Sequence, residues 1–312
     1  MKKRNLLFLV FILAIVFVLL LTQIKKDIEP EELKDKYADD LSKFMEINGL
    51  EIHYKDVGEA DKPVLLLLHG IASSLHVWDG WTAELAKHYR IVSLDLPGFG
   101  LTGPDADSDY SQDYYNEFLC QFLDELGIEK CHIAGNSMGG WISWGMARAY
   151  PERIEKMVLL NAAGYPFPDK ISLIFDLAKH PILKYSVHYI SPRFLIKQTL
   201  EEVYFDKKQI TEDLVTRYHE LSRRRGNRKA LVDCVCNNVI GNEEQHYQIQ
   251  GIKTPTLVLW GDRDKWISVE NAFRFEADLE NARCIIYENV GHVPMEEIAV
   301  RSAADAHEFL AA

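Results

Sequence analysis

Short, mostly apolar runs alternate along the chain with amphipathic helical segments, and this alternation constrains the possible folds more than any other feature. Runs of this kind are typical of strands that are covered on both faces. They lie at 63–68, 90–94, 131–134, 156–160, 256–260 and 282–287. Helical spacing is found at 78–89, 110–127, 138–150, 269–279 and 296–310. Strand followed by helix, repeated, predicts an α/β fold: a mostly parallel sheet with helices on both faces.

The strand–helix alternation is interrupted by residues 165–247, which are helical and irregular and contain several prolines. We interpret this stretch as a helical cap inserted into a core formed by residues 45–164 and 248–312. Ligands bind at the carboxyl edge of the strands in open parallel sheets, so a cap at this position is expected to cover a binding site. At the start of the core, Asn48-Gly49 lies between two runs of alternating polarity and predicts a β-hairpin.

The N-terminal part differs in composition from the rest of the chain. Residues 6–21 are uninterrupted apolar sequence, three basic residues precede them, and no small-residue cleavage site follows. With its neighbours the stretch is long enough to span a bilayer, and the basic residues favour a cytoplasmic N-terminus. We therefore expect residues 1–26 to form a single-pass membrane anchor, with a charged spacer at 27–44 and the catalytic domain outside the cytoplasm. A cleaved signal peptide is the alternative.

The net charge of the chain is −12 at pH 7, and residues 1–26 contribute only basic charges, so the remainder is strongly acidic. An acidic body repels phosphate backbones, and we therefore expect no nucleic-acid partner. One dense basic cluster lies at 223–229. We interpret it as the solvated end of a helix, with a contact to anionic lipid head groups as the alternative. The cysteines fit no metal-binding spacing, so no metal site is expected. The oligomeric state is left open.

Residues 135–139, Gly-Asn-Ser-Met-Gly, form a Gly-x-Ser-x-Gly motif between a predicted strand and a predicted helix. In this context the serine sits on a strained turn that lifts its hydroxyl above the sheet, and the glycines let strand and helix approach closely. Ser137 is therefore the predicted nucleophile.

A serine nucleophile needs a general base and a carboxylate that orients the base. His292 lies in a loop directly after the last predicted strand, and it follows the serine in the chain as the order serine, acid, histidine requires. Two carboxylates, Asp262 and Asp264, follow the strand at 256–260. We assign the orienting role to Asp264, which lies further into the loop, and keep Asp262 as the alternative. Asn161, at the other strand end where an acid is common, has no charge to supply.

The oxyanion that forms during acyl transfer needs hydrogen-bond donors. We expect one from the backbone N–H of Met138, directly after the nucleophile, and the other from the backbone N–H of Ile71, in the loop after the strand at 63–68. His69, in the same loop, is expected to brace it. Asp95 is expected to support the floor of the pocket rather than to act as the catalytic acid.

Together these motifs resemble the α/β-hydrolase superfamily over roughly residues 45–312. The resemblance is carried by His69-Gly70 with Ser74 and Trp78 after it, and by the motifs at 95–100, 135–140, 260–264 and 291–294. It implies the α/β-hydrolase fold, a Ser137–Asp264–His292 triad, the oxyanion hole described above and no cofactor. Within the superfamily, the apolar N-terminus joined to this core is similar to membrane-bound monoacylglycerol lipases and esterases.

We therefore predict a serine hydrolase that cleaves carboxylic esters through an acyl-enzyme, with small hydrophobic, lipid-like esters such as monoacylglycerols as substrates. Residues 136–140 are also similar to the C–C hydrolases of aromatic ring-cleavage pathways, and that reaction is the alternative. Two departures count against it: the loop at 70–74 lacks the Gly-Pro-Gly pattern, and Val293 stands where those enzymes usually have Trp. A non-catalytic binding protein of the same fold is a further alternative, although each triad position keeps a suitable residue.

Overall fold

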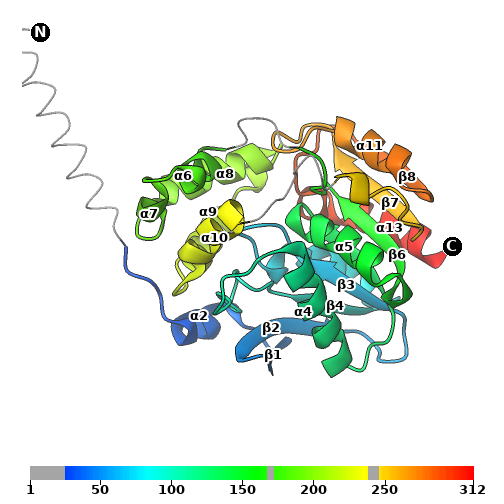
Figure 1. Ribbon diagram of the computed structural model, residues 1–312, viewed down its shortest axis with the longest axis horizontal. Helices are drawn as coiled ribbons and strands as arrows, with labels where there is room; N and C mark the ends of the chain where they lie inside the picture. The colour runs from blue at the N-terminus through cyan, green and yellow to red at the C-terminus, as the bar shows by residue number, and fades with distance from the viewer. Residues whose placement is uncertain (1–24, 167–171, 238–245) are drawn as a thin grey trace, which may run out of the picture.

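The computed structural model describes residues 25–312 except 167–171 and 238–245 (Figure 1). Its centre is an eight-stranded sheet in the order β1-β2-β4-β3-β5-β6-β7-β8. Strand β2 pairs antiparallel with β1 and β4, and all other neighbouring strands pair in parallel. The strands are β1 (Ser42–Ile47), β2 (Leu50–Val57), β3 (Val64–Leu68), β4 (Arg90–Leu94), β5 (Cys131–Asn136), β6 (Ile154–Leu160), β7 (Thr256–Gly261) and β8 (Ala282–Tyr287).

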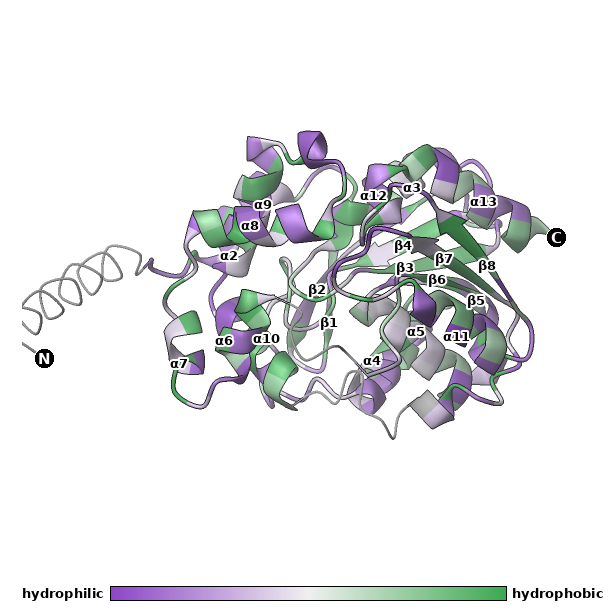
Figure 2. Cartoon of the chain, turned by 90° about the horizontal axis from the view of Figure 1, so that it is seen from above, coloured by the Kyte–Doolittle hydropathy of each residue, from purple (hydrophilic) through white to green (hydrophobic). Residues whose placement is uncertain are grey.

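Helices cover both faces of this sheet (Figure 2). One face carries α3 and α13, which contact each other, and the opposite face carries α4, α5 and α11. These helices are α3 (Asp79–Leu85), α4 (Gln112–Glu125), α5 (Met138–Ala149), α11 (Glu270–Asp278) and α13 (Ala299–Ala311). The predicted fold class, a mostly parallel sheet between two helical layers, is confirmed.

The central strands are buried because both of their faces are covered. Every residue of β5 and β7 is buried, and so are all residues of β3 after its first. The antiparallel edge begins with the predicted hairpin, whose turn residues Asn48 and Gly49 have positive φ values of 52° and 79°. One predicted helix differs: the segment expected at 296–310 consists of α12 (Pro294–Glu297) and α13, because Ile298 between them has non-helical backbone angles.

Between β6 and β7 the chain forms a set of helices that is separate from the two layers on the sheet. We call them the inserted helices. They are α6 (Leu173–Lys179), α7 (Lys184–Val187), α8 (Arg193–Val203), α9 (Glu212–Ser222) and α10 (Asn227–Asn237). In Figure 1 they lie together on the side of the molecule opposite to β7, β8 and the C-terminus.

The charged segment that we expected to act as a spacer is packed against the body instead. It contains α2 (Pro30–Tyr37), whose Leu33 is 1% exposed and packs with Leu101 and Leu221. The backbone N–H of Ile28 also donates to the carbonyl of Arg223 at 2.8 Å. The sequence-based interpretation counted the charges of this segment and missed the apolar side of its helix.

The membrane-anchored cellular location that the sequence predicted has to be corrected. Within the described parts of residues 25–312, no helix combines the length and the apolar character that crossing a membrane requires. The apolar stretch expected to form the anchor lies in residues 1–24, outside the described residues. We therefore assign neither the single-pass anchor nor the extracytoplasmic location.

Candidate active site

Ser137 lies at the sharp turn between β5 and α5, at the carboxyl edge of the sheet. Its backbone has φ 56° and ψ −116°, a left-handed φ that is rare for any residue except glycine. The turn is held because the Ser137 N–H donates to the carbonyl of Leu160 at 3.1 Å, while the Ser137 carbonyl accepts from the N–H groups of Trp141 and Ala163. The structure thus shows the strained strand–turn–helix geometry that the motif predicts.

The two glycines of the motif are needed where backbones cross closely. A Cβ on Gly135 would lie 2.2 Å from the carbonyl oxygen of Gly139, and a Cβ on Gly139 would lie 2.2 Å from that of Leu68. Neither distance is compatible with a side chain. The glycines therefore allow α5 to start directly above β3 and β5, which holds the serine turn in place.

His292 lies in the loop after β8, and both the core and the inserted helices hold it. Its N–H donates to the carbonyl of Val203 at the end of α8 (2.8 Å), and its carbonyl accepts from Asn136 Nδ2 (2.9 Å). Its ring Nδ1 is 2.7 Å from Asp264 Oδ2. This contact assigns the proton to Nδ1 and leaves Nε2 as the basic nitrogen. Nε2 is buried and has no hydrogen-bond partner within the described residues.

The structure places Asp264, and not Asp262, against His292. The second oxygen of Asp264, Oδ1, accepts from the backbone N–H groups of Trp266 and Ile267 at 2.8 and 3.0 Å. Asp262 instead accepts from the backbone N–H of Asn289 at 2.7 Å, on the outer side of the loop. The catalytic roles of these carboxylates stay a prediction, but their geometry separates them clearly.

Asn161 is a residue whose part in the site the sequence did not reveal. It follows β6 with a left-handed φ of 45°, its side chain is fully buried, and its Nδ2 donates to Asp264 Oδ2 at 2.7 Å. Its Oδ1 accepts from the backbone N–H of Gly261. We judged Asn161 only as a possible acid. Its position at the end of the strand beside β7 was the signal that it could contact the carboxylate instead.

The two expected oxyanion donors belong to residues close to Ser137 in the fold or in the chain. Ile71 lines the cavity with Ser137, and Met138 is the first residue of α5, so its N–H has no acceptor within that helix. The loop that contains Ile71 is braced by His69, whose Nδ1 donates to the carbonyl of Gly70 at 2.7 Å and whose Nε2 accepts from the N–H of Leu96 at 3.0 Å. Burial lowers the pKa of His69, which suits a neutral structural histidine.

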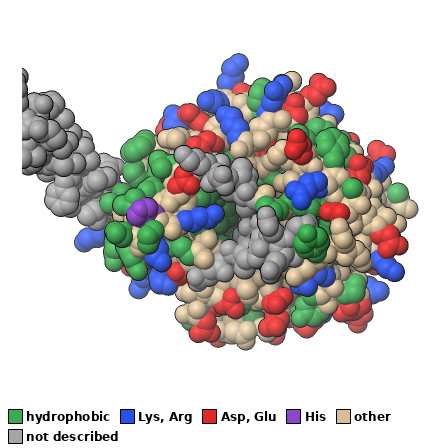
Figure 3. Space-filling view, turned by 45° about the horizontal axis from the view of Figure 1, so that its top comes forward, with side chains coloured by type: hydrophobic (Ala, Val, Ile, Leu, Met, Phe, Trp, Pro, Cys, Tyr) green, Lys and Arg blue, Asp and Glu red, His purple; other side chains and the backbone are tan. Residues whose placement is uncertain are grey.

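Ser137 and His292 line a mostly apolar cavity between the core and the inserted helices. Core residues supply the wall around the serine, and all five inserted helices supply the opposite wall. The inserted-helix lining includes Ile174, Phe175, Ile196, Leu200, Tyr218 and Leu231. Figure 3 shows that this face is hollowed, with hydrophobic side chains gathered beside the hollow. An acyl chain or another apolar group fits such a lining better than a highly charged substrate does.

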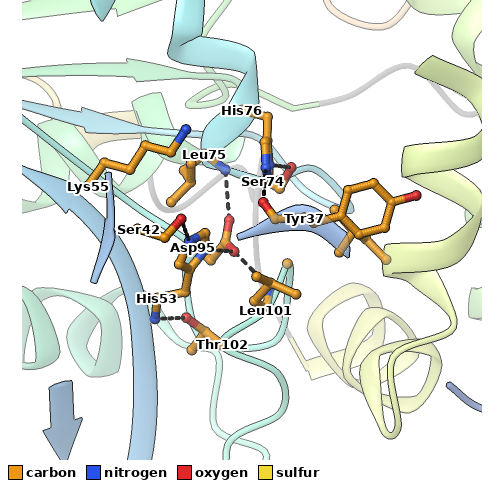
Figure 4. Close-up of polar contacts among 12 residues, drawn as sticks. Tyr37, Ser42, His53, Lys55, Ser74, Leu75, His76, Asp95, Leu101 and Thr102 are labelled. Carbon is orange, nitrogen blue, oxygen red and sulfur yellow. Dashed lines mark hydrogen bonds and ion pairs between the residues drawn. The ribbon is translucent and has the colours of Figure 1, made fainter. Parts of the chain in front are cut away.

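A second Ser–His–Asp arrangement lies among β1, β2 and β4 (Figure 4). His53 Nδ1 is 2.7 Å from Asp95 Oδ2, and His53 Nε2 is 2.8 Å from Ser42 Oγ. Asp95 also accepts from the backbone N–H groups of Leu75 and Leu101, both at 2.7 Å. None of the three side chains lines the cavity. Asp95 joins the turn after β3 to the loop after β4, the supporting role expected from the sequence.

The electrostatics of Asp95 fit this role. Burial by itself would raise the pKa of the Asp95 carboxyl, but the neighbouring His53, through its charge and its hydrogen bond, outweighs burial and holds the pKa well below its usual range. The carboxylate is therefore kept charged inside the protein, where it binds two backbone loops together.

Comparison with known proteins identifies a family and several relatives. The family described as alpha/beta hydrolase fold matches residues 63–298. One relative is the 2-hydroxy-6-oxononadienedioate/2-hydroxy-6-oxononatrienedioate hydrolase of Paraburkholderia phymatum. It is 29% identical over 273 residues, which cover 84% of this chain and 91% of the relative.

Two solved structures are also similar over most of their length. The first is a membrane phospholipase A described as a bacterial virulence factor, with a TM-score of 0.74, 27% identity, and coverage of 99% of this chain and 98% of the other. The second is a meta-cleavage product hydrolase from Pseudomonas fluorescens IP01, with a TM-score of 0.72, 25% identity, and coverage of 86% and 97%. The similar proteins thus include enzymes named for different reactions.

Proposed function

This chain belongs to the alpha/beta hydrolase fold family, and on that premise we propose that it is a serine hydrolase with Ser137 as nucleophile, His292 as general base and Asp264 as the residue that orients the base. The observation that carries the proposal is the environment of His292. Its Nδ1 is 2.7 Å from Asp264, and its buried Nε2 has no partner among the described residues. Both His292 and Ser137 line the same cavity.

In the proposed reaction, His292 Nε2 takes the proton of Ser137 Oγ while that oxygen attacks a carbonyl carbon of the substrate. The N–H groups of Ile71 and Met138 donate to the carbonyl oxygen as it becomes an oxyanion. The bond to the leaving group then breaks, His292 returns the proton to that group, and Ser137 keeps the acyl group. Water, deprotonated by His292, attacks the acyl-enzyme, and the acid leaves as the serine recovers its proton.

The relatives favour a carbon–carbon bond as the bond that is cleaved. The Paraburkholderia phymatum enzyme is named as a hydrolase of oxo-dienedioates, and the Pseudomonas fluorescens structure is named as a meta-cleavage product hydrolase. Our first candidate reaction is therefore hydrolysis of the C–C bond beside the carbonyl of a vinylogous diketone. The departing carbon is then stabilised as an enolate before His292 protonates it. The sequence alone offered this reaction as the alternative and not as the main expectation.

Ester hydrolysis is the second candidate, and two observations favour it. The similar membrane phospholipase A, an enzyme name that denotes ester cleavage, is covered almost completely by this chain. The loop at residues 70–74 and Val293 also differ from the pattern usual in the C–C hydrolases. Hydrophobic esters such as monoacylglycerols remain the proposed substrates for this reaction.

The first experiment tests the nucleophile. Wild type should react covalently with a fluorophosphonate probe, and Ser137→Ala should lose labelling and all but a residual fraction of turnover, because the attacking oxygen is gone. Ser143→Ala is the matched control, since Ser143 is a buried serine in α5 that donates to the carbonyl of Gly139. Equal labelling of wild type and Ser137→Ala would refute the nucleophile. A wild type that neither reacts nor turns over any substrate would favour a non-catalytic protein.

The second experiment separates the two reactions. A 2-hydroxy-6-oxo-dienoate, a p-nitrophenyl ester series and a monoacylglycerol are compared by kcat/KM in the same preparation. The first candidate requires the dienoate to exceed the best ester. The reverse order would replace C–C hydrolysis with ester hydrolysis and leave the assignment of Ser137 intact.

A further inference from the structure

Arg228 stands apart from the other residues that line the cavity. It lies in the first turn of α10, and its side chain is 5% exposed. Among the described residues that line the cavity it is the only Lys or Arg, and none of them is Asp or Glu. The sequence-based interpretation placed Arg228 in a solvated basic cluster at 223–229. Burial of Arg228, and of Arg224 at 9% exposure, shows that this is wrong for two members of the cluster.

The hydrogen bonds of Arg228 leave part of its guanidinium unused. Nη2 donates to Asp27 Oδ1 at 2.5 Å and to the carbonyl of Lys25 at 2.8 Å. Nε and Nη1 are buried and have no partner among the described residues. Buried donors on a charged group are costly to leave unpaired, so the site is incomplete as it stands.

A structural role, holding the N-terminal segment in place, does not explain why Arg228 keeps two unpaired donors among the described residues. Arg228 helps to hold the segment at 25–28 against the inserted helices, but Arg223 donates to the carbonyl of Lys26 at 2.8 Å, and Ile28 pairs with Arg223 and Arg224 through the backbone. The segment is therefore tied down by other contacts. The N–H groups of Arg228 Nε and Nη1 are therefore available to bind a ligand.

We propose that Arg228 forms an anion subsite in the cavity, which binds a carboxylate carried by the substrate. A carboxylate matches the planar guanidinium and can accept from two of its N–H groups at once. Ser191 also lines the cavity, and its Oγ is buried and has no hydrogen-bond partner in the described part of the chain, so it is a further available donor. The inference rests on the proposed hydrolase function, because Ser137 and Arg228 share the cavity. It assigns the substrate class: an acyl compound with an apolar body and an acidic group.

The experiment compares two p-nitrophenyl esters of equal carbon number, one neutral and one with a terminal carboxylate, at six, eight and ten acyl carbons. The measured quantity is the ratio of kcat/KM for the acidic ester to that for the neutral ester. Arg228→Met should lower this ratio on the order of tenfold or more at the preferred length, because a charge-assisted hydrogen-bonded pair is lost. The ratio is the readout because any loss of turnover that both esters share cancels in it.

Two further variants make the result specific. Lys229→Met removes the same charge from the neighbouring residue, which is exposed, pairs with Asp233 and does not line the cavity, so the ratio should not change. Asp27→Asn removes the negative charge that offsets the charge of Arg228, so the attraction of Arg228 for an anion and the ratio should rise. If Arg228→Met fails to fold, Asp27→Asn still decides: an unchanged ratio overturns the subsite.

A binding measurement keeps this inference separate from the proposed function. Free suberate, an eight-carbon dicarboxylate, should raise the Tm of the wild type and not that of Arg228→Met, whether or not any ester is hydrolysed. Turnover of neutral esters with no preference for the acidic ester, and no suberate effect, would refute the subsite alone. Absence of labelling at Ser137 with a retained suberate effect would refute the hydrolase and not the subsite.

Discussion

The orienting role proposed for Asp264 requires a fixed carboxylate, and hydrogen bonds hold both of its oxygens. Oδ1 accepts from two backbone N–H groups, and Oδ2 receives His292 Nδ1 and Asn161 Nδ2, each at 2.7 Å. The contact from Asn161 comes from a different strand than Asp264 does. We therefore regard Asn161 as a positioning residue that acts through the carboxylate.

Replacing Asn161 with Gly should lower kcat by about ten- to a hundredfold, which corresponds to the loss of a hydrogen bond to a charged group. Glycine is a suitable replacement because it adopts the left-handed φ of 45° without strain. It removes the whole Asn161 side chain, including the oxygen that accepts from the Gly261 N–H. KM should change little, since Asn161 does not line the cavity. Steady-state kinetics checks this split. A Gly variant with wild-type kcat, or one in which KM changes and kcat does not, would contradict the positioning role.

At the scale of elements, Asp95 connects two loops that flank the carboxyl edge of the sheet. It accepts from Leu75, which follows the expected oxyanion loop after β3, and from Leu101, which lies in the loop after β4. Its partner His53 comes from β2. A single buried carboxylate thus sets the relative position of three segments that are distant in the chain.

Asp95→Ala should destabilise the fold by about 3 kcal/mol at neutral pH, because it leaves His53 and two buried N–H groups unpaired. The pKa of Asp95 is lower in the folded protein than in the unfolded chain, so its contribution is present above about pH 4 and is lost as the pH falls towards the folded value. Urea unfolding of both proteins between pH 3 and pH 7 measures this.

The difference in unfolding free energy should be constant near neutrality and shrink in acid. Ser42→Ala removes the outer contact of His53 at 2.8 Å and the exposed contacts of Ser42 Oγ with Asp39, and it should cost about 1 kcal/mol. If the difference in unfolding free energy between wild type and Asp95→Ala grows as the pH falls, the predicted direction of the pH dependence is wrong.

At the scale of the whole molecule, three parts of the chain meet around the cavity. The core supplies Ser137 and His292, the inserted helices supply the opposite wall, and the segment at 25–37 packs on the outer side of those helices. The isolated bridge between Ile28 and Arg224 and the burial of Leu33 make this segment part of the folded body.

Leu33→Ala should therefore lower the free energy of unfolding by about 2 kcal/mol, the lower end of the range for buried leucines, because Leu33 packs in a small cluster. Leu41→Ala is the control, since Leu41 is 49% exposed and its replacement should change stability by less than about 0.5 kcal/mol. Chemical unfolding followed by circular dichroism measures both. Equal stabilities of the two variants would indicate that the segment at 25–37 does not pack stably on the body and acts as a spacer.

Local sequence patterns were enough to predict the order of the strands, the helices between them and the turn at Ser137. These depend on local spacing: apolar runs covered on both faces, helical periodicity, and glycines where a strand meets a helix. The placement of His292 after the last strand was also predictable, because the carboxyl ends of parallel strands meet at one edge of the sheet.

Local patterns did not show which side chains from distant segments meet, and the folded structure shows these contacts. It brings Asn161 onto Asp264, sets Asp262 apart from His292, and turns Arg228 from an expected surface residue into a buried one. It also folds the charged N-terminal segment onto the body. The physical reason is common to all four: a side chain's charge and polarity are local properties, whereas its burial and its hydrogen-bond partners depend on what the rest of the chain places beside it.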